Sequence, residues 1–155
     1  MKKLLLLSVL LIFACSSDDE VTETFLERYN GIVWDIDTDG GGAEYSLIAF
    51  TNEPQGFIGG PGLATCHEVI FGIPYESTIE ASTVTNLVTI IENSENRLEY
   101  LFTDDAEGEF DWAFEYSVLY EVIDDGNNIN VTYTLGDVIR PFEGIRTELL
   151  VSSCD

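Results

Sequence analysis

The sequence predicts an all-β domain, folded as an antiparallel up-and-down barrel of about eight to ten short strands. The clearest evidence is the segment 110–122, where aromatic and aliphatic side chains occupy nearly every second position. Such alternation indicates a half-buried strand, because successive side chains of a strand point to opposite faces of its sheet. A turn sequence at 124–128 and a second alternating run at 129–135 complete a long hairpin. A β-sandwich is the alternative arrangement of the same strands.

The elements outside this hairpin can be taken in order. Thr24 to Glu27 has the sequence of a capping box, which predicts a short N-terminal helix ending at Asn30-Gly31. A second hairpin is expected, with arms at 87–92 and 97–103 around a polar turn. The remaining strands are expected at residues 32–37, 44–51, 56–59, 66–72, 77–83 and 145–152. Because the sequence shows neither an internal repeat nor a linker, residues 24–155 are interpreted as a single domain.

Residues 1–14 have the features of a secretory signal peptide, since two lysines precede an apolar run that is too short to span a bilayer. The run ends at Ile12-Phe13-Ala14-Cys15, which resembles the lipobox of bacterial lipoproteins, although a small residue is usual at the place of Phe13. The resemblance implies that Cys15 becomes the acylated first residue of the mature protein and anchors it in a membrane.

The next segment, residues 15–23, is interpreted as a lipidated acidic tether. In the lipoprotein family, an aspartate directly after the cysteine often retains the protein in the inner membrane, so Ser16 favours the outer membrane. Asp18, Asp19 and Glu20 resemble the acidic tag that sends some lipoproteins to the cell surface. We therefore expect a lipid-anchored protein of the outer membrane at the cell surface, with the periplasmic face as the alternative.

Two further cysteines, Cys66 and Cys154, remain after Cys15 is modified. In the oxidising compartment that export implies, an even pair predicts one disulfide. The alternatives are two free thiols, one of them with a catalytic or metal-binding role, and disulfides between chains.

The mature chain is strongly acidic. Loss of both lysines with the signal peptide leaves four arginines against 29 acids, a net charge of −25. Such a surface repels nucleic acid and favours cations or basic partners. His67 is the only histidine, and the sequence contains no phosphate-binding loop, nucleophile elbow or metal-binding histidine pair. We therefore expect a protein that is not an enzyme and that uses no cofactor.

Gly31-Ile32-Val33-Trp34, between the predicted helix and a meander of strands, resembles the start of a lipocalin barrel. Lipocalins carry Gly-x-Trp at this place, one residue shorter than the spacing in this chain, and a long C-terminal helix is not evident here. The resemblance implies that Trp34 plugs the base of a barrel. It also implies a disulfide, here between Cys66 and Cys154, that ties a mid-chain strand to the C-terminal segment.

One face of the predicted strand at 110–122 is a candidate ligand site. Trp112, Phe114, Tyr116 and Tyr120 share this face because they are separated by even numbers of residues. A barrel of about eight strands is the size at which side chains either fill the interior or leave room for one small ligand. The four residues are therefore expected to line a ligand cavity or, as the alternative, to form part of a packed core.

A candidate metal site precedes Gly40. Asp35, Asp37 and Asp39 have the spacing of the first ligands in a calcium loop. An EF-hand is excluded, because Ser46 stands where that loop needs a bidentate acid. The two remaining interpretations are a weak extracellular calcium site and a strand with outward-facing carboxylates.

These features together predict a lipid-anchored surface protein whose barrel binds a small apolar ligand. The alternative is a structural or interaction module, for adhesion or envelope assembly, whose acidic surface contacts a protein or calcium. In either case the protein contacts the membrane through Cys15, and nucleic acid is not a partner.

Overall fold

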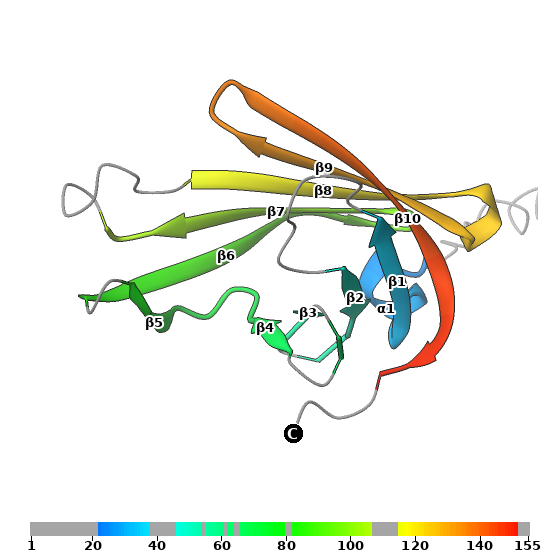
Figure 1. Cartoon of the computed structure of the whole chain (residues 1–155), viewed down its shortest axis with the longest axis horizontal. Coiled ribbons are helices and arrows are strands. Elements are labelled where there is room, and N and C mark those ends of the chain that lie inside the picture. The colour runs from blue at the N-terminus through cyan, green and yellow to red at the C-terminus, as the bar shows by residue number, and fades with distance from the viewer. Residues whose placement is uncertain are drawn as a thin grey trace, which may run out of the picture.

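The computed structural model describes residues 22–37, 46–53, 55–60, 62–63, 66–79, 82–106 and 115–151. Within these ranges, one short helix precedes ten strands (Figure 1). The elements are α1 (Phe25–Arg28), β1 (Ile32–Asp37), β2 (Leu47–Phe50), β3 (Phe57–Gly60), β4 (His67–Val69), β5 (Tyr75–Ile79), β6 (Ser82–Ser94), β7 (Arg97–Asp104), β8 (Glu115–Ile123), η1 (Asp124–Gly126), β9 (Asn128–Leu135) and β10 (Val138–Leu150). None of the described helices is long and apolar enough to cross a membrane.

The ten strands form one antiparallel sheet in the order β4-β3-β2-β1-β10-β9-β8-β7-β6-β5. Each ladder joins strands that are consecutive in sequence, apart from the ladder between β1 and β10. The sheet curls on itself, so that β1 to β4 face β6 to β9 (Figure 1). The predicted up-and-down arrangement is confirmed. The strands form one continuous sheet and not the two packed sheets of the alternative β-sandwich.

The segment after β4 links the two edges of the curled sheet. Phe71 forms a parallel bridge with Val88 of β6, and the N–H of Gly72 donates to the carbonyl oxygen of Val88 over 2.8 Å. In the described residues, β4 and β5 are the two edge strands and do not pair with each other. The sheet is therefore a half-barrel whose concave face is partly enclosed.

α1 covers one end of the half-barrel, which we call the base. Thr24 Oγ1 accepts a hydrogen bond from the Glu27 N–H over 3.4 Å, and the Glu27 carboxylate accepts one from the Thr24 N–H over 2.8 Å. The capping box predicted from the sequence is thus present. The hydroxyl of Tyr29 donates to Asn96 Oδ1 over 2.8 Å, which fixes the end of the helix to the β6–β7 turn.

Aromatic side chains fill the base. Phe25, Trp34 and Phe50 are fully buried. The rings of Phe25 and Phe50 meet edge to face with 4.8 Å between their centroids, and Tyr29 lies 6.1 Å from Trp34. Burial of one large apolar side chain contributes about 1.5–3 kcal/mol, so this cluster is a main source of stability.

The last strand is longer than the sequence predicts. β10 begins at Val138, well before the expected start at 145, because it pairs with β9 before it reaches β1 at Glu143. Proline is rare in central strands, so the presence of Pro141 argues against a strand when the sequence is considered alone. It is tolerated because this part of β10 has a strand on one side only. The strand expected at 77–83 is likewise divided between the end of β5 and the start of β6.

Candidate ligand cavity

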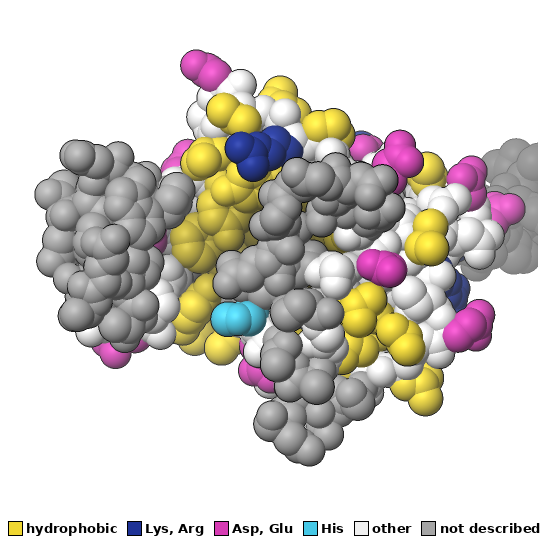
Figure 2. Space-filling model, viewed as in Figure 1, with side chains coloured by type: hydrophobic (Ala, Val, Ile, Leu, Met, Phe, Trp, Pro, Cys, Tyr) yellow, Lys and Arg dark blue, Asp and Glu magenta, His cyan; other side chains and the backbone are white. Residues whose placement is uncertain are grey.

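The concave face of the sheet holds a cavity of about 620 Å³. Each of the ten strands contributes at least one residue to its wall, and most of these residues are aliphatic or aromatic. Figure 2 shows a hollow on this side of the molecule that is lined by yellow hydrophobic side chains. The wall follows from the pleat of the strands, because every second side chain of β7, β8 and β9 points to the concave face.

Three aromatic rings form a row across β7, β8 and β9 at the end opposite the base. We call this row, made of Phe102, Tyr116 and Tyr133, the mouth. Phe102 stacks on Tyr116 with 4.7 Å between ring centroids and an interplanar angle of 14°, and Tyr116 lies 4.9 Å from Tyr133. All three side chains are only partly buried. The mouth therefore presents aromatic surface that a bound molecule can cover.

Two tyrosines deeper in the cavity form its floor. Tyr100 and Tyr120 are 5% and 4% exposed, and their ring centroids are 6.0 Å apart. Burial raises the pKa of both phenols, in Tyr100 well above the usual value. Phe57 lies 6.3 Å from Tyr120 and adds a third ring to the floor.

Asn86 is a buried polar residue in the wall, with 3% of its surface exposed. Its Nδ2 donates to Ser77 Oγ over 2.8 Å and to the carbonyl oxygen of Tyr75 over 3.3 Å. Both partners belong to the edge strand β5, whereas Asn86 belongs to β6. The amide thus holds the edge strand in place beside the cavity, which accounts for its burial.

Two of the four residues predicted to line a cavity lie in its wall. Tyr116 and Tyr120 do so, whereas Trp112 and Phe114 lie outside the described residues. The cavity as a place for a ligand stays a prediction. Sequence reasoning missed Tyr100 and Tyr133, although the period-two signal that marks β8 is also present in β7 and β9.

His67, the only histidine of the sequence, also borders the cavity. It lies on the short edge strand β4 opposite Gly59 of β3, and its side chain is exposed. This position could not be read from the sequence, because it depends on how β4 is placed against the rest of the sheet.

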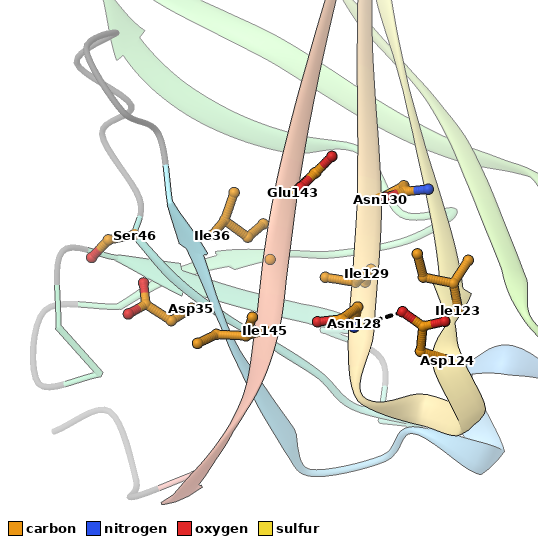
Figure 3. Close-up of a pocket in the computed structure, with 11 residues that line it drawn as sticks. Asp35, Ile36, Ser46, Ile123, Asp124, Asn128, Ile129, Asn130, Glu143 and Ile145 are labelled. Carbon is orange, nitrogen blue, oxygen red and sulfur yellow. Dashed lines mark hydrogen bonds between the residues drawn. The ribbon is translucent and has the colours of Figure 1, made fainter.

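A second hollow lies on the convex face, over β1, β10 and β9 (Figure 3). Asp35 and Asn128 flank Ile145 there, each as its partner on a neighbouring strand. The side-chain amide of Asn128 donates to the carboxylate of Asp124 over 2.8 Å. Because Ile145 and Glu143 are exposed in this hollow, it is open surface of mixed polarity.

The residues predicted to bind calcium begin on this convex face. Asp35 lies within β1 and lines the outer hollow, Asp37 is the last residue of β1, and Asp39 lies outside the described residues. Among the residues that the structure describes, no three His, Cys, Asp or Glu side chains gather as a metal site requires. A calcium site that includes Asp39 stays a prediction.

The predicted lipid anchor and disulfide also involve residues that the structure leaves out. Cys15 and Cys154 lie outside the described residues, and Cys66 directly precedes β4. The acylation of Cys15 and the pairing of Cys66 with Cys154 therefore stay predictions.

Comparison with protein-family models and with curated proteins gives no match. Among solved structures, the crystal structure of secretory abundant heat soluble protein 4 from Ramazzottius varieornatus is similar, with a TM-score of 0.48 and 14% sequence identity. The similarity covers 78% of this chain and 96% of that chain.

Proposed function

We propose that this protein is a lipid-anchored surface protein that binds a small apolar molecule on the concave face of its half-barrel. The observation that supports this proposal most is the cavity itself. Its volume of about 620 Å³ falls within the range of roughly 300–1,000 Å³ that is usual for small-molecule sites. Its wall is mainly aromatic and aliphatic with few polar groups, which is the usual composition of such sites.

The two ends of the cavity also suit a bound molecule. The base is filled by α1, Trp34 and Phe50, so the space does not continue through the half-barrel. At the mouth, the rings of Phe102 and Tyr116 remain partly exposed. A ligand that covers these rings gains about 25 cal/mol for each Å² of apolar surface that leaves water.

The anchoring part of the proposal rests on the sequence. Ile12-Phe13-Ala14-Cys15 provides the lipobox-like site, and only a short acidic segment separates Cys15 from α1. We expect Cys15→Ser to abolish labelling by radioactive fatty acid and to release the protein from membranes. A Cys15→Ser protein that still sediments with membranes contradicts the anchor.

The binding part can be tested by thermal unfolding with a panel of compounds: fatty acids, sterol-like compounds, haem, sugars, and calcium against a chelator. A ligand present at a hundred times its Kd adds about 2.7 kcal/mol of stability, which corresponds to several degrees in Tm for a domain of this size. A shift with apolar compounds is the expected result. A shift with calcium alone favours the Asp35–Asp39 segment, and no shift with any compound favours the alternative of a protein-interaction module.

Filling the cavity sharpens this test. Val118 is 5% exposed and lines the cavity, so Val118→Trp places an indole where the ligand is proposed to lie. The Tm shift caused by an apolar ligand should then disappear. Ile145→Trp, at a 60% exposed position on the convex face, is the matched control and should retain the shift. Val131→Phe is the smaller cavity-filling change, for use if Val118→Trp does not fold.

A further inference from the structure

Arg140 stands on the cavity side of β10, at the mouth. It pairs with Tyr133 of β9, and two residues later Phe142 pairs with Val131. Cross-strand partners and alternate residues of a strand lie on the same face of a sheet. Tyr133 and Phe142 line the cavity, so the side chain of Arg140 leaves the sheet on the concave face. Burial raises the pKa of the Tyr133 phenol, and the nearby charge of Arg140 opposes that shift.

The guanidinium of Arg140 is available to an outside anion. Within the part of the chain that the structure describes, the ion pairs are those of Arg28 and Arg97, and Arg140 makes none. The side chain is exposed. Figure 2 shows dark blue basic side-chain atoms directly beside the yellow hollow. The structure thus places at the edge of an apolar cavity a cation that has no carboxylate partner among the described residues.

We infer that the ligand is a single-chain amphiphile with one anionic head group, whose chain lies in the cavity and whose head pairs with Arg140. This inference rests on the proposed function, since it names the class of molecule that the cavity binds. The planar fork of a guanidinium binds carboxylate and phosphate oxygens in pairs, so both head groups belong to this class.

The cavity provides room for the chain. From Tyr116 at the mouth to Tyr120 at the floor, the wall extends along β8 for roughly 13 Å. The rings of Tyr100, Tyr120 and Phe57 close the floor. All three side chains are aromatic and buried, so the floor presents mainly ring surface to the chain. The polar end of the ligand therefore belongs at the mouth.

The acidic surface of the protein does not prevent this binding. Repulsion between an anion and distant carboxylates is screened beyond about 8 Å at physiological salt, whereas a contact pair with Arg140 is screened much less. Among the described residues that line the cavity, Glu68 on the edge strand β4 is the only carboxylate, so the head group meets one acidic side chain of the lining and the guanidinium of Arg140.

Three probes with one chain length test the inference on the purified full chain by isothermal titration: decanoate, decyl phosphate and the neutral decanol. We expect decanoate to bind more tightly than decanol. Arg140→Gln should weaken decanoate binding roughly fivefold, the effect of an exposed ion pair, and leave decanol binding unchanged. Arg146→Gln is the matched control. Arg146 is also exposed on β10, but its ladder partner on β1 is Trp34, which lies at the base. This substitution should change neither the affinity for decanoate nor that for decanol.

Each outcome bears on one of the two proposals. If decyl phosphate shows the larger dependence on Arg140, the inference holds and the head group is phosphate-like. Equal binding of decanoate and decanol, with no effect of Arg140→Gln, overturns the anionic head and leaves the cavity proposal intact. If Arg140→Gln and Arg146→Gln weaken decanoate binding equally, the inference of a head group paired with Arg140 is also overturned, because the overall charge of the protein then explains the result. If none of the three probes binds, the proposed function itself is contradicted.

Discussion

The base and the mouth of the half-barrel are built from similar residues in different ways. At the base, Phe25 and Trp34 are fully buried and α1 covers the end of the sheet. At the mouth, Phe102 stacks on Tyr116, Tyr133 lies tilted beside Tyr116, and all three rings remain partly exposed. Aromatic residues therefore occupy two environments in this fold: those at the base stabilise the sheet, and those at the mouth leave ring surface exposed, where we propose that a ligand binds.

The largest expected difference between the two ends is in stability. Trp34→Ala removes a fully buried ring, and such a change usually costs about 3–5 kcal/mol because a cavity is left behind. Tyr116→Ala at the mouth removes a partly exposed ring and should cost about 1 kcal/mol. Urea unfolding of both variants measures the difference. Equal losses would show that the two ends contribute alike to stability.

Gly144 tests how closely the strands approach near the base. A Cβ atom at this position would lie 2.8 Å from Ile129 Cγ2 and 3.1 Å from the carbonyl oxygen of Asp35. Gly144→Ala should therefore destabilise the protein by about 1–3 kcal/mol, the usual effect of overpacking. A Cβ atom at Gly62 has nothing within 4 Å, so Gly62→Ala is the control and should change the unfolding free energy by less than about 0.5 kcal/mol.

A further difference, between the buried tyrosines of the floor and the partly exposed ones of the mouth, appears at high pH. Burial raises the pKa of Tyr100 and Tyr120 above the unfolded value of about 10. Below pH 10 both states keep the phenol proton. As the pH rises further, the unfolded state loses protons that the folded state retains, so stability falls by about 1.4 kcal/mol per pH unit for each such tyrosine.

This pH dependence can be followed through phenolate absorbance and urea unfolding. Two phenols should ionise only when the protein unfolds, and Tyr120→Phe should reduce the loss of stability above pH 10. Tyr133→Phe, at the mouth, should reduce it less. If all phenols ionise together near pH 10 in the folded protein, the floor is open to water.

The amino-acid pattern alone reveals the strands whose two faces differ. The alternation around Tyr116 and Tyr120 predicts one shared face, and the structure places both residues in the cavity wall. The hairpin expected at 87–103 is present as β6 and β7. These elements are predictable because hydrophobic periodicity is a local signal.

Arg140 shows why other parts of the proposed site are not predictable from the sequence. Its strand contains Pro141 and several exposed apolar residues, so residues 138–144 lack a simple alternating pattern. The strand forms because β9 offers a complementary edge, which is a tertiary effect. The register between β9 and β10 places Tyr133 opposite Arg140. This register depends on how the whole sheet is assembled.

The ladder between β1 and β10 also has a consequence for how the chain acquires its fold. Ile32 pairs with Leu150, although the two residues are near opposite ends of the domain's sequence. The strands from β6 to β9, in contrast, pair in consecutive hairpins. In a chain synthesised or exported from its N-terminus, the hairpins of β1 to β4 and those of β6 to β9 can therefore form early, but the two halves join only after β10 has emerged. A ribosome that stopped before Val138 would release a chain whose first four strands have lost the ladder that joins them to the rest of the sheet.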